Sequence, residues 1–550
     1  MNIWAWTDRL RADLRAAGHT ELAAKLWQLP PDVSAHRHDR VDAAYPELLA
    51  AARTLGNPWM EVFVRHWRLQ SLNLRRDATR QLAEAVEALE FSHREETRSC
   101  PQSVCTVQDV CLAYGNVDGP GYVEERLAVI GEILERIDPS WGCYRCISIE
   151  EADALRDGGR LAESAVAVRR RHAEYAAAHG AHDAPTLAAL ASALQSAEEH
   201  EEALALARDV EGLLPDDDEI VSARLTQCAA LIALGRHDEA AAVLPSSRAA
   251  GEFDAWSRWG EAHLQLVEAG RRENSVDAAV PLAVAAADYL ERGSFNTAFN
   301  QAETVLRLAV GRGARESALA ALATMEGARA GLRTPGRVDD RLAAARRLVD
   351  GLAPAELPCA PDELAAHLEA QDVIEPEPAL DLVAVALAAR PADTALIILR
   401  ARLLAALGRG GEADAGLWSL VQADPSSEEL ANAFLQVRWN DNGALLRLAQ
   451  LVRGDQPRVA DWAEANVAFR TQDHETVIVR CAAIVADDPS VVNTRRMWAL
   501  ACRQLGRHAD EQRLWQEIVD LGGEACMFDM CPGPDEPFVG MMTCRACEAV

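Results

Sequence analysis

Apolar residues recur along almost the whole chain at the spacing of one face of an α-helix. In one typical stretch the positions i, i+3, i+4 and i+7 hold Leu187, Leu190, Ala191 and Leu194, which is the period of an amphipathic helix. Alternating runs rich in Val, Ile and Thr, which would predict strands, are nearly absent. Short turns marked by Gly, Asn, Asp or Pro separate the helical stretches. The pattern therefore predicts an all-α chain of antiparallel helical hairpins.

The hairpins repeat with a nearly constant period. Prolines at the turns between hairpins are spaced by 34, 32 and 32 residues, and the turns within hairpins are spaced by 32, 32 and 34 residues. Two independent marks therefore share one period near 34 residues, which is the length of a tetratricopeptide repeat. The prolines are Pro391, Pro425, Pro457 and Pro489, and the turns within hairpins lie at Gly408, Asn440, Gln472 and Gly506.

One unit resembles the tetratricopeptide-repeat family at four positions. The family places Gly or a polar residue at the turn, a small residue five positions later, a bulky residue four beyond that, and Pro at the end. The resemblance covers about 185–250 and 380–520. It implies a right-handed superhelical solenoid that binds a protein or peptide in its groove. The four places are held by Gly408, Ala413, Leu417 and Pro425, and parts of the pattern recur at Gly235, Ala240 and Leu244 and at Ala203 and Pro215.

The breaks in the helical pattern divide the chain into six predicted segments. A zone rich in Gly and Pro interrupts the repeats after residue 330, with a helix expected at Arg337–Leu352. The segments are N-terminal helical repeats at 1–98, a cysteine-stapled hairpin at 99–150, tetratricopeptide-like repeats at 151–352, a Pro-rich junction at 353–380, C-terminal repeats at 381–521, and a short Cys-rich C-terminal cap at 522–550.

Length and charge narrow the class of protein. The chain has 550 residues, which is too long for one globular core, and repetition accounts for that length. Its formal net charge is −30. This acidic balance argues against nucleic-acid binding, which needs a basic footprint. It weakly favours a basic partner.

The single lysine, Lys25, excludes several enzyme classes. Every other Lys-or-Arg position is arginine, which is typical of a GC-rich genome. Walker A phosphate loops and protein kinases both need a lysine at a fixed place in their motifs. The motifs G-x-S-x-G and H-E-x-x-H are also absent. We therefore expect a protein that is not an enzyme.

The chain also lacks the sequence features of a membrane or exported protein. No stretch of about 18 apolar residues predicts a transmembrane helix, and the charged first fifteen residues do not match a signal peptide. We expect a cytoplasmic protein that binds no membrane. Because cytoplasmic thiols stay reduced, the 13 cysteines are first considered as metal ligands or buried thiols.

The first cysteine set has the pattern Cys-x4-Cys, a spacer and Cys-x2-Cys. Helices expected at 106–114 and 122–137, with a turn at 115–121, would bring all four cysteines to one end of a hairpin. Four thiolates can hold one structural Zn²⁺ in a tetrahedron. Free buried thiols are the alternative, and Cys111 is expected to be packing within the first helix. The set consists of Cys100, Cys105, Cys143 and Cys146.

The second cysteine set repeats this pattern close to the C-terminus. Its segment contains several prolines and cannot form one continuous helix, so a metal ion would help it to fold. A second structural Zn²⁺ is predicted, with a redox-active or disulfide pair and a disordered tail as the alternatives. Four thiolates leave no open coordination position, so neither zinc would be catalytic. The set consists of Cys526, Cys531, Cys544 and Cys547.

A cluster of carboxylates in the middle of the chain is a candidate docking site for a basic peptide or protein. The alternative is a solvated helix face and turn, and the basic run Arg169–Arg171 could pair with the cluster from one unit earlier. The candidate residues are Glu198, Glu199, Glu201, Glu202, Asp216, Asp217 and Asp218.

Together these observations predict a protein–protein interaction scaffold or adaptor. It would bind a protein or peptide in the groove of its repeats, with a basic partner suited to the acidic charge, and two structural zinc ions would stabilise it. A redox- or metal-responsive sensor is one alternative, and a non-catalytic subunit of an enzyme or effector complex is another. The oligomeric state is left open.

Overall fold

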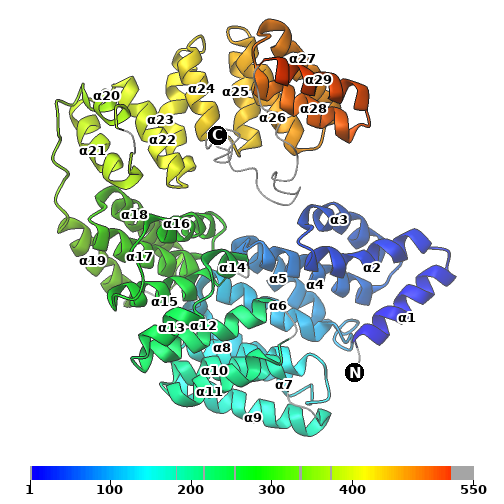
Figure 1. The fold of residues 1–550 in the computed structure, drawn as a ribbon. Coiled ribbons are helices and arrows are strands. Elements are labelled where there is room, and N and C mark those ends of the chain that lie inside the picture. The colour runs from blue at the N-terminus through cyan, green and yellow to red at the C-terminus, as the bar shows by residue number, and fades with distance from the viewer. Residues whose placement is uncertain are drawn as a thin grey trace. The chain divides into compact units, whose positions relative to one another are not determined.

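A computed structural model describes residues 3–180, 183–214, 217–252, 255–333, 337–371 and 374–521. All regular structure in these ranges is helical (Figure 1). The chain divides into two compact units, Met1–Pro354 and Ala355–Val550, and the division falls inside the Pro-rich segment 353–380. No helix in the described ranges has the length and apolar character needed to cross a membrane.

The N-terminal unit consists of successive helical hairpins. The predicted helix at Arg337–Leu352 is confirmed as the last of its helices. They are α1 Ile3–Ala16, α2 Thr20–Ser34, α3 His38–Thr54, α4 Pro58–Leu74, α5 Ala78–Ser92, α6 Ser103–Asp118, the 3-10 turn η1 Gly119–Tyr122, α7 Val123–Leu134, α8 Tyr144–Asp157, α9 Leu161–His179, α10 Ala184–Ser196, α11 His200–Glu211, α12 Asp217–Ala233, α13 His237–Val243, α14 Ser247–Glu252, α15 Trp256–Glu268, α16 Val276–Glu291, α17 Phe295–Arg312, α18 Arg315–Gly331 and α19 Arg337–Asp350.

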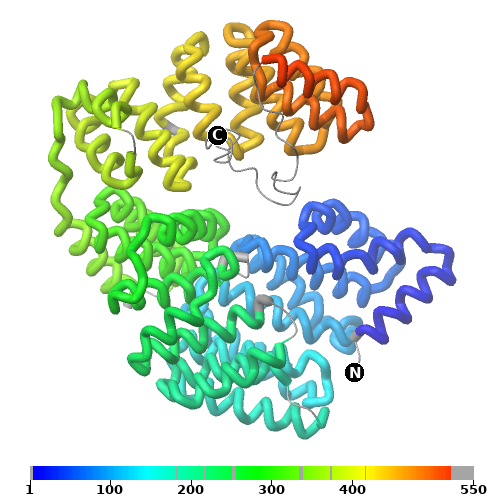
Figure 2. Tube along the Cα trace, in the orientation of Figure 1, coloured from blue at the N-terminus to red at the C-terminus, as the bar shows by residue number. Residues whose placement is uncertain are grey.

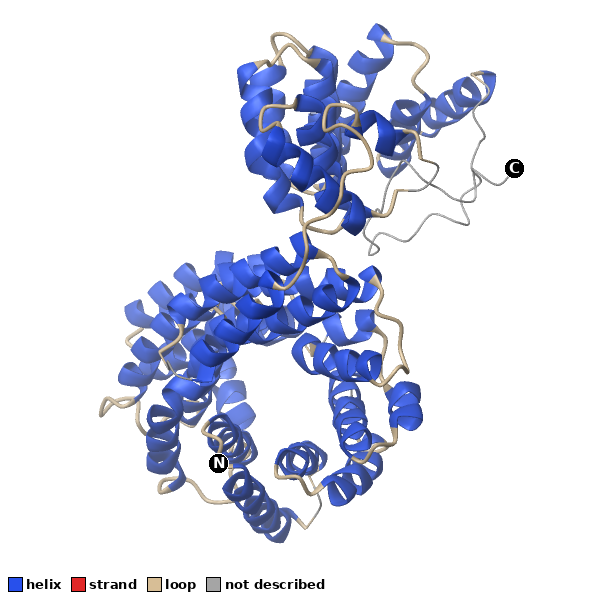
Figure 3. Cartoon of the chain, turned by 90° about the vertical axis from the view of Figure 1, so that its left-hand side faces the viewer, coloured by secondary structure: helices blue, strands red, loops and turns tan. Residues whose placement is uncertain are grey.

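The first helices of successive hairpins lie side by side in this unit. Each of α8, α10, α12, α15, α17 and α19 contacts the next in that series. We call these six helices the inner helices, and the helices that follow them in each hairpin form a second layer. Because each hairpin turns relative to the one before, the series curves around a centre (Figure 3). Stacked hairpins that contact only their neighbours form a solenoid.

The curvature brings late hairpins of this unit back against early ones (Figure 2). Helix α17 contacts α6, although nearly 200 residues separate them in the sequence. The backbone N–H of Ala78 donates to the carbonyl of Arg292 at 2.9 Å. The backbone N–H of Arg333 donates to the Asp118 carboxylate at 2.7 Å, and its guanidinium lies 4.2 Å above the Tyr122 ring. These contacts close the N-terminal unit on itself.

The C-terminal unit holds the most regular repeats. Its hairpins follow the predicted turns, and the expected small and bulky residues Ala413 and Leu417 are both buried. The ring centroid of Trp418 lies 4.9 Å from that of Phe434 in the next hairpin. The helices are α20 Leu364–Glu369, α21 Pro376–Ala389, α22 Thr394–Ala406, α23 Gly410–Ala423, α24 Glu428–Val437, α25 Asn442–Val452, α26 Pro457–Arg470, α27 His474–Asp487, α28 Val492–Gln504 and α29 His508–Asp520.

Ion pairs join equivalent places in successive repeats of this unit. Arg458 donates to Glu428, 30 residues earlier, at 2.8 Å and to Asp488, 30 residues later, at 3.3 Å. Arg507 donates to Glu475, 32 residues earlier, at 2.5 Å. These separations are close to the period of the sequence pattern. The pairs are solvent-exposed, so each contributes little to stability, but they show that the repeats are in register.

Residues with a left-handed backbone conformation mark the turns within hairpins. Gly408, Gln472 and Gly506 each lie two residues after the end of a helix, and their φ angles are +69°, +60° and +70°. A residue at this place closes the last helical turn best when it is Gly, because Gly has no Cβ that hinders positive φ. Gln472 therefore adopts a conformation that suits glycine better.

Replacing Gln472 by Gly is expected to raise the free energy of unfolding by about 0.5–1 kcal/mol, because it removes the Cβ from a left-handed position. The matched variant Gly506→Gln should lower it by a similar amount. Urea unfolding followed by circular dichroism measures both changes. Two shifts of the same sign would show that the two turns are not equivalent.

The hairpin predicted for the first cysteine set differs from the observed one. The turn expected at 115–121 begins four residues later than predicted, because α6 continues through Gly115 to Asp118. Tertiary contacts override the glycine: the Asn116 side chain donates to Asn73 at 2.8 Å and to Gln81 at 3.0 Å. The chain turns instead at Gly119–Tyr122, where Asp118 accepts the backbone N–H of Gly121. Helix α6 also begins before Cys105, so that residue lies within the helix.

Candidate functional site

The inner helices of the N-terminal unit line a groove of about 610 Å³. Residues of α10, α12, α15, α17 and α19 contribute, so the groove runs across several hairpins. Its lining combines small and aliphatic side chains with amide and charged side chains. The lining residues include Gln195, Leu225, Ala229, Ile232, Arg258, Glu261, Ala262, Gln265, Asn300, Glu303, Thr304 and Arg341.

Arg258 is the cation of this groove that has no carboxylate partner among the described residues. Its guanidinium donates to the Ser222 hydroxyl at 2.9 Å, to the Ser222 carbonyl at 3.1 Å and to the Thr226 hydroxyl at 2.7 Å. These neutral acceptors orient the guanidinium without cancelling its charge.

Arg258 stays charged in this position. Desolvation by the surrounding helices lowers the pKa of its guanidinium to about 10, which is still well above neutrality, and the side chain is exposed to solvent. A ligand carboxylate would therefore meet a charged, exposed guanidinium with which it can form charge-assisted hydrogen bonds.

Arg341, by contrast, is already neutralised. Its guanidinium donates to both carboxylate oxygens of Glu303, with Nε–Oε distances of 3.2 and 3.1 Å, and to the Asn300 amide oxygen at 2.8 Å. The Gln265 amide donates to Glu261 at 3.0 Å. These groups add hydrogen-bonding sites to the groove, and the Glu261 carboxylate lies on α15, the helix that also carries Arg258.

A second hollow, of about 730 Å³, lies between α7, α8 and α9. Its arginines already have partners, because Arg160 pairs with Glu163 at 2.7 Å and Arg170 pairs with Glu151 at 3.5 Å. This hollow is larger than the inner groove but offers no comparable cation. The inner groove is therefore the better candidate for a binding site.

The structure brings together part of the first predicted cysteine set. The sulfur atoms of Cys105 in α6 and Cys143 at the start of α8 lie 3.3 Å apart. Cys146 follows in the first turn of α8. Cys100 packs in a separate apolar cluster with Phe91 and residues of the first helices. No group of three or more His, Cys, Asp or Glu side chains in the described ranges is placed to hold a metal ion, and zinc at this set stays a prediction.

A histidine–carboxylate pair lies beside these thiols. The His66 Nδ1 atom is 2.8 Å from Asp109, and the Gln70 amide donates to the other oxygen of Asp109 at 2.6 Å. His66 and Asp109 both act electrostatically on Cys143. The sequence did not indicate this pair, because α4 and α6 bring it together from positions 43 residues apart.

Three further cysteines have the properties of packing residues. Cys228, Cys481 and Cys502 are buried, as the helical pattern predicted. Burial raises the pKa of the Cys228 thiol to about 11 and that of the Cys481 thiol to about 12, so both stay protonated. The second predicted set, Cys526, Cys531, Cys544 and Cys547, lies outside the described residues.

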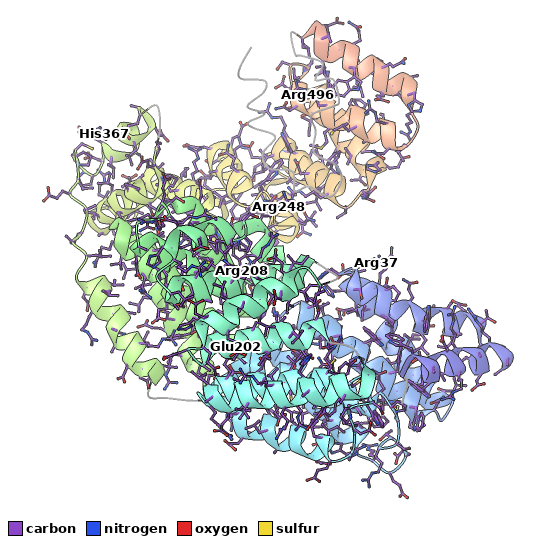
Figure 4. The ribbon with its side chains drawn as sticks, turned by 60° about the horizontal axis from the view of Figure 1, so that its bottom comes forward. Arg37, Glu202, Arg208, Arg248, His367 and Arg496 are labelled. Atoms are coloured by element: carbon purple, nitrogen blue, oxygen red, sulfur yellow. The ribbon has the colours of Figure 1, made fainter. Side chains whose placement is uncertain are left out.

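The acidic cluster has a structural role at the turn between α10 and α11. Glu198 adopts a left-handed φ of +66°, and Glu201 and Glu202 lie in the first turn of α11, where negative charge is favourable. Arg169 of α9 pairs with Glu202 at 2.8 Å and with Glu199 at 3.6 Å. Figure 4 labels Glu202 on α11.

These contacts confirm that the basic run can pair with the acidic cluster from one unit earlier. Asp216 lies outside the described residues, as do the side chains of Asp217 and Asp218. Docking of a partner on this cluster stays a prediction.

Sequence reasoning did not single out Arg258. Its acceptors, Ser222 and Thr226, precede it by 36 and 32 residues, which is about one repeat. That spacing is the only signal that could have linked them, and it does not show whether a carboxylate is nearby.

The fold and the groove define an all-α helical-repeat protein of the solenoid class. No known family model matches the chain, and no curated protein matches it.

Three solved structures illustrate what the chain is similar to. The maize pentatricopeptide repeat protein PPR10 is 15% identical, with a TM-score of 0.23, over 94% of this chain and 87% of that one. Naa15/Naa10 bound to HypK-THB is 14% identical, with a TM-score of 0.22, over 91% and 76%. An IFIT1 mutant with m7Gppp-AAAA is 12% identical, with a TM-score of 0.23, over 84% and 90%. At these values the likeness does not indicate what the present chain binds.

Proposed function

We propose that this chain is a non-catalytic scaffold or adaptor of tetratricopeptide-like hairpins, and that its inner groove binds an extended segment of a partner protein. The segment carries a carboxylate that pairs with Arg258. The observation that carries the proposal is the charged, oriented guanidinium of Arg258, which has neutral acceptors on one side and the open groove on the other.

The rest of the groove suits a polypeptide in extended form. Leu225 and Ala262 are buried in its floor, so apolar side chains of a ligand would find apolar contacts there. Gln195 and Gln265 are half-buried at its walls, and amide side chains can both donate to and accept from a peptide backbone. Concave faces of stacked repeats commonly form such extended binding surfaces.

Charge favours a peptide over a nucleic acid as the ligand. Arg341 is paired with Glu303, Glu261 adds a carboxylate to the groove, and the whole chain carries a formal charge of −30. Nucleic-acid binding depends on many uncompensated cations that contact phosphates. One unpaired arginine matches one carboxylate better than it matches a phosphate backbone.

Selection from a library of random displayed peptides tests the proposal with the full chain as bait. Peptides enriched on the wild type should carry Asp, Glu or a free C-terminal carboxylate. The Arg258→Ala variant should bind them roughly tenfold to a hundredfold more weakly, because a hydrogen bond to a charged group contributes about 1.5–3 kcal/mol. Fluorescence anisotropy with the selected peptides measures the loss.

Two further variants sharpen this test. Arg258→Glu should enrich peptides that carry Lys or Arg instead, because the groove charge is reversed. Arg208→Ala is the matched control, since Arg208 lies on α11 (Figure 4) and pairs there with Glu239 at 3.4 Å. Equal binding by wild type and Arg258→Ala would refute the proposal. So would enrichment of a random RNA pool in place of peptides.

A further inference from the structure

The two closest cysteine sulfurs in the described residues belong to different hairpins. The Sγ atoms of Cys105 and Cys143 are 3.3 Å apart, whereas a disulfide bond is about 2.05 Å long. Each residue keeps 8% of its surface exposed. The two sulfurs therefore need to move only a little to bond.

Both thiols lie at helix N-termini. Cys143 is the N-cap residue of α8, Cys105 lies in the first turn of α6, and a helix N-terminus favours a thiolate. Either thiol of the pair can therefore act as the nucleophile, with the other as its hydrogen-bond partner.

The neighbouring cysteines are placed differently. Cys146 lies in the first turn of α8 after Cys143, Cys111 is completely buried within α6, and Cys100 lies in another apolar cluster. Among the described cysteines, the pair with sulfurs in contact is thus Cys105 and Cys143.

We propose that Cys105 and Cys143 are a redox modification site, at which hydrogen peroxide or another hydroperoxide forms a reversible disulfide between α6 and α8. The thiolate of one cysteine attacks the peroxide, the O–O bond breaks, hydroxide leaves, and that cysteine becomes a sulfenic acid. The sulfur of the other cysteine then attacks the sulfenic sulfur, the S–O bond breaks, and the second hydroxide leaves. Two thiols and one molecule of hydrogen peroxide give one disulfide and two molecules of water, and two electrons pass to the peroxide.

The disulfide would fix the junction between two neighbouring hairpins. It would tie the first turn of α6 to the start of α8, across the whole of α7 and its flanking turns. Oxidation should therefore shift the thermal unfolding midpoint of this region upward. A thiol reductant should reverse the shift. This inference does not depend on the ligand of the inner groove, because the cysteine pair lies outside the residues that line it.

Trypsin provides a sharp test, because it separates the two cysteines of α8. The folded full chain is treated with hydrogen peroxide, free thiols are blocked with N-ethylmaleimide, and the denatured protein is digested without reductant. Cleavage at arginines gives peptides 99–126, 137–145 and 146–156, which contain Cys100 with Cys105 and Cys111, Cys143 alone, and Cys146 alone. Mass spectrometry should find 99–126 joined to 137–145 with the loss of two hydrogen atoms.

Four single variants assign the bond. The joined peptides should disappear in Cys105→Ser and in Cys143→Ser, and they should persist in Cys100→Ser and in Cys111→Ser. Peptide 137–145 that stays unjoined after oxidation, or that joins 146–156 instead, would overturn the inference. It would also be overturned by tightly bound zinc in the isolated protein that falls by one equivalent in Cys143→Ser, since both thiols would then be metal ligands.

Discussion

Replacing Arg126 by Met is expected to lower the free energy of unfolding of the N-terminal unit by about 3–5 kcal/mol, because removal of the guanidinium leaves the Asp157 carboxylate without its partner. Arg126 is only 2% exposed. Its guanidinium lies 2.5 Å from Asp157 and 3.7 Å from the buried Glu150. Urea unfolding followed by circular dichroism measures the loss, and hydrogen exchange should locate it in α6, α7 and α8.

Two control variants separate this effect from general damage. Arg160→Met removes an exposed arginine that pairs with Glu163, and its effect should stay within about 0.5 kcal/mol. The double variant Arg126→Met with Asp157→Asn should recover part of the stability, because it removes the paired carboxylate together with its partner. An unchanged loss in the double variant would show that packing, and not charge, causes the effect.

The same cluster gives stability a defined dependence on pH. Burial, followed by repulsion from Asp153, raises the pKa of the Glu150 carboxyl from 4.5 to about 8. The folded state therefore holds a proton that the unfolded state releases between these two values. Stability should fall as the pH rises through this window. Thermal midpoints of the wild type should show this fall, and those of Glu150→Gln should show less of it.

Replacing Phe299 by Ala is the second change with a large expected effect. Phe299 is 1% exposed and belongs to α17, which contacts α15, α16, α18, α19 and also α6. Truncation of a buried Phe costs about 3–5 kcal/mol, because it removes apolar contacts and leaves a cavity. Hydrogen exchange should become faster in the helices around α17.

The range of this effect tests the repeat architecture. Because each repeat interacts mainly with its neighbours, exchange in helices α22–α29 should not change. Val284→Ala is the matched control, since Val284 lies on the adjacent α16 with 44% of its surface exposed and should change stability by less than about 0.5 kcal/mol. Faster exchange throughout the chain would contradict a stack of locally coupled repeats.

The local features of the fold could be predicted from the sequence. Gly408 and Gly506 mark helix ends because positive φ suits glycine, and the buried Ala413 and Leu417 follow from the helical period. Gly115 misled the prediction, because contacts of its neighbour Asn116 with Asn73 and Gln81 hold the helix together.

The candidate sites could be predicted only in part. The cysteine pattern predicted that Cys100, Cys105, Cys143 and Cys146 meet at one end of a hairpin. It could not show that Cys105 and Cys143 are the two with sulfurs in contact. Whether a carboxylate pairs with Arg258 depends on how the hairpins stack, and the sequence pattern does not give that arrangement. Closure of the N-terminal unit through Arg333 and Asp118 joins residues that are 215 positions apart, and no local pattern encodes such a contact.

The central claim is that the inner helices of the N-terminal unit form the binding surface. Hydrogen exchange of the full chain, with and without a peptide selected on it, tests this claim most directly. The account predicts slower exchange in α12, α15 and α17 on binding, and no such change when Arg258→Ala is mixed with the same peptide. Protection confined to α9, α11 and α13, or equal protection of the Arg258→Ala variant, would contradict it.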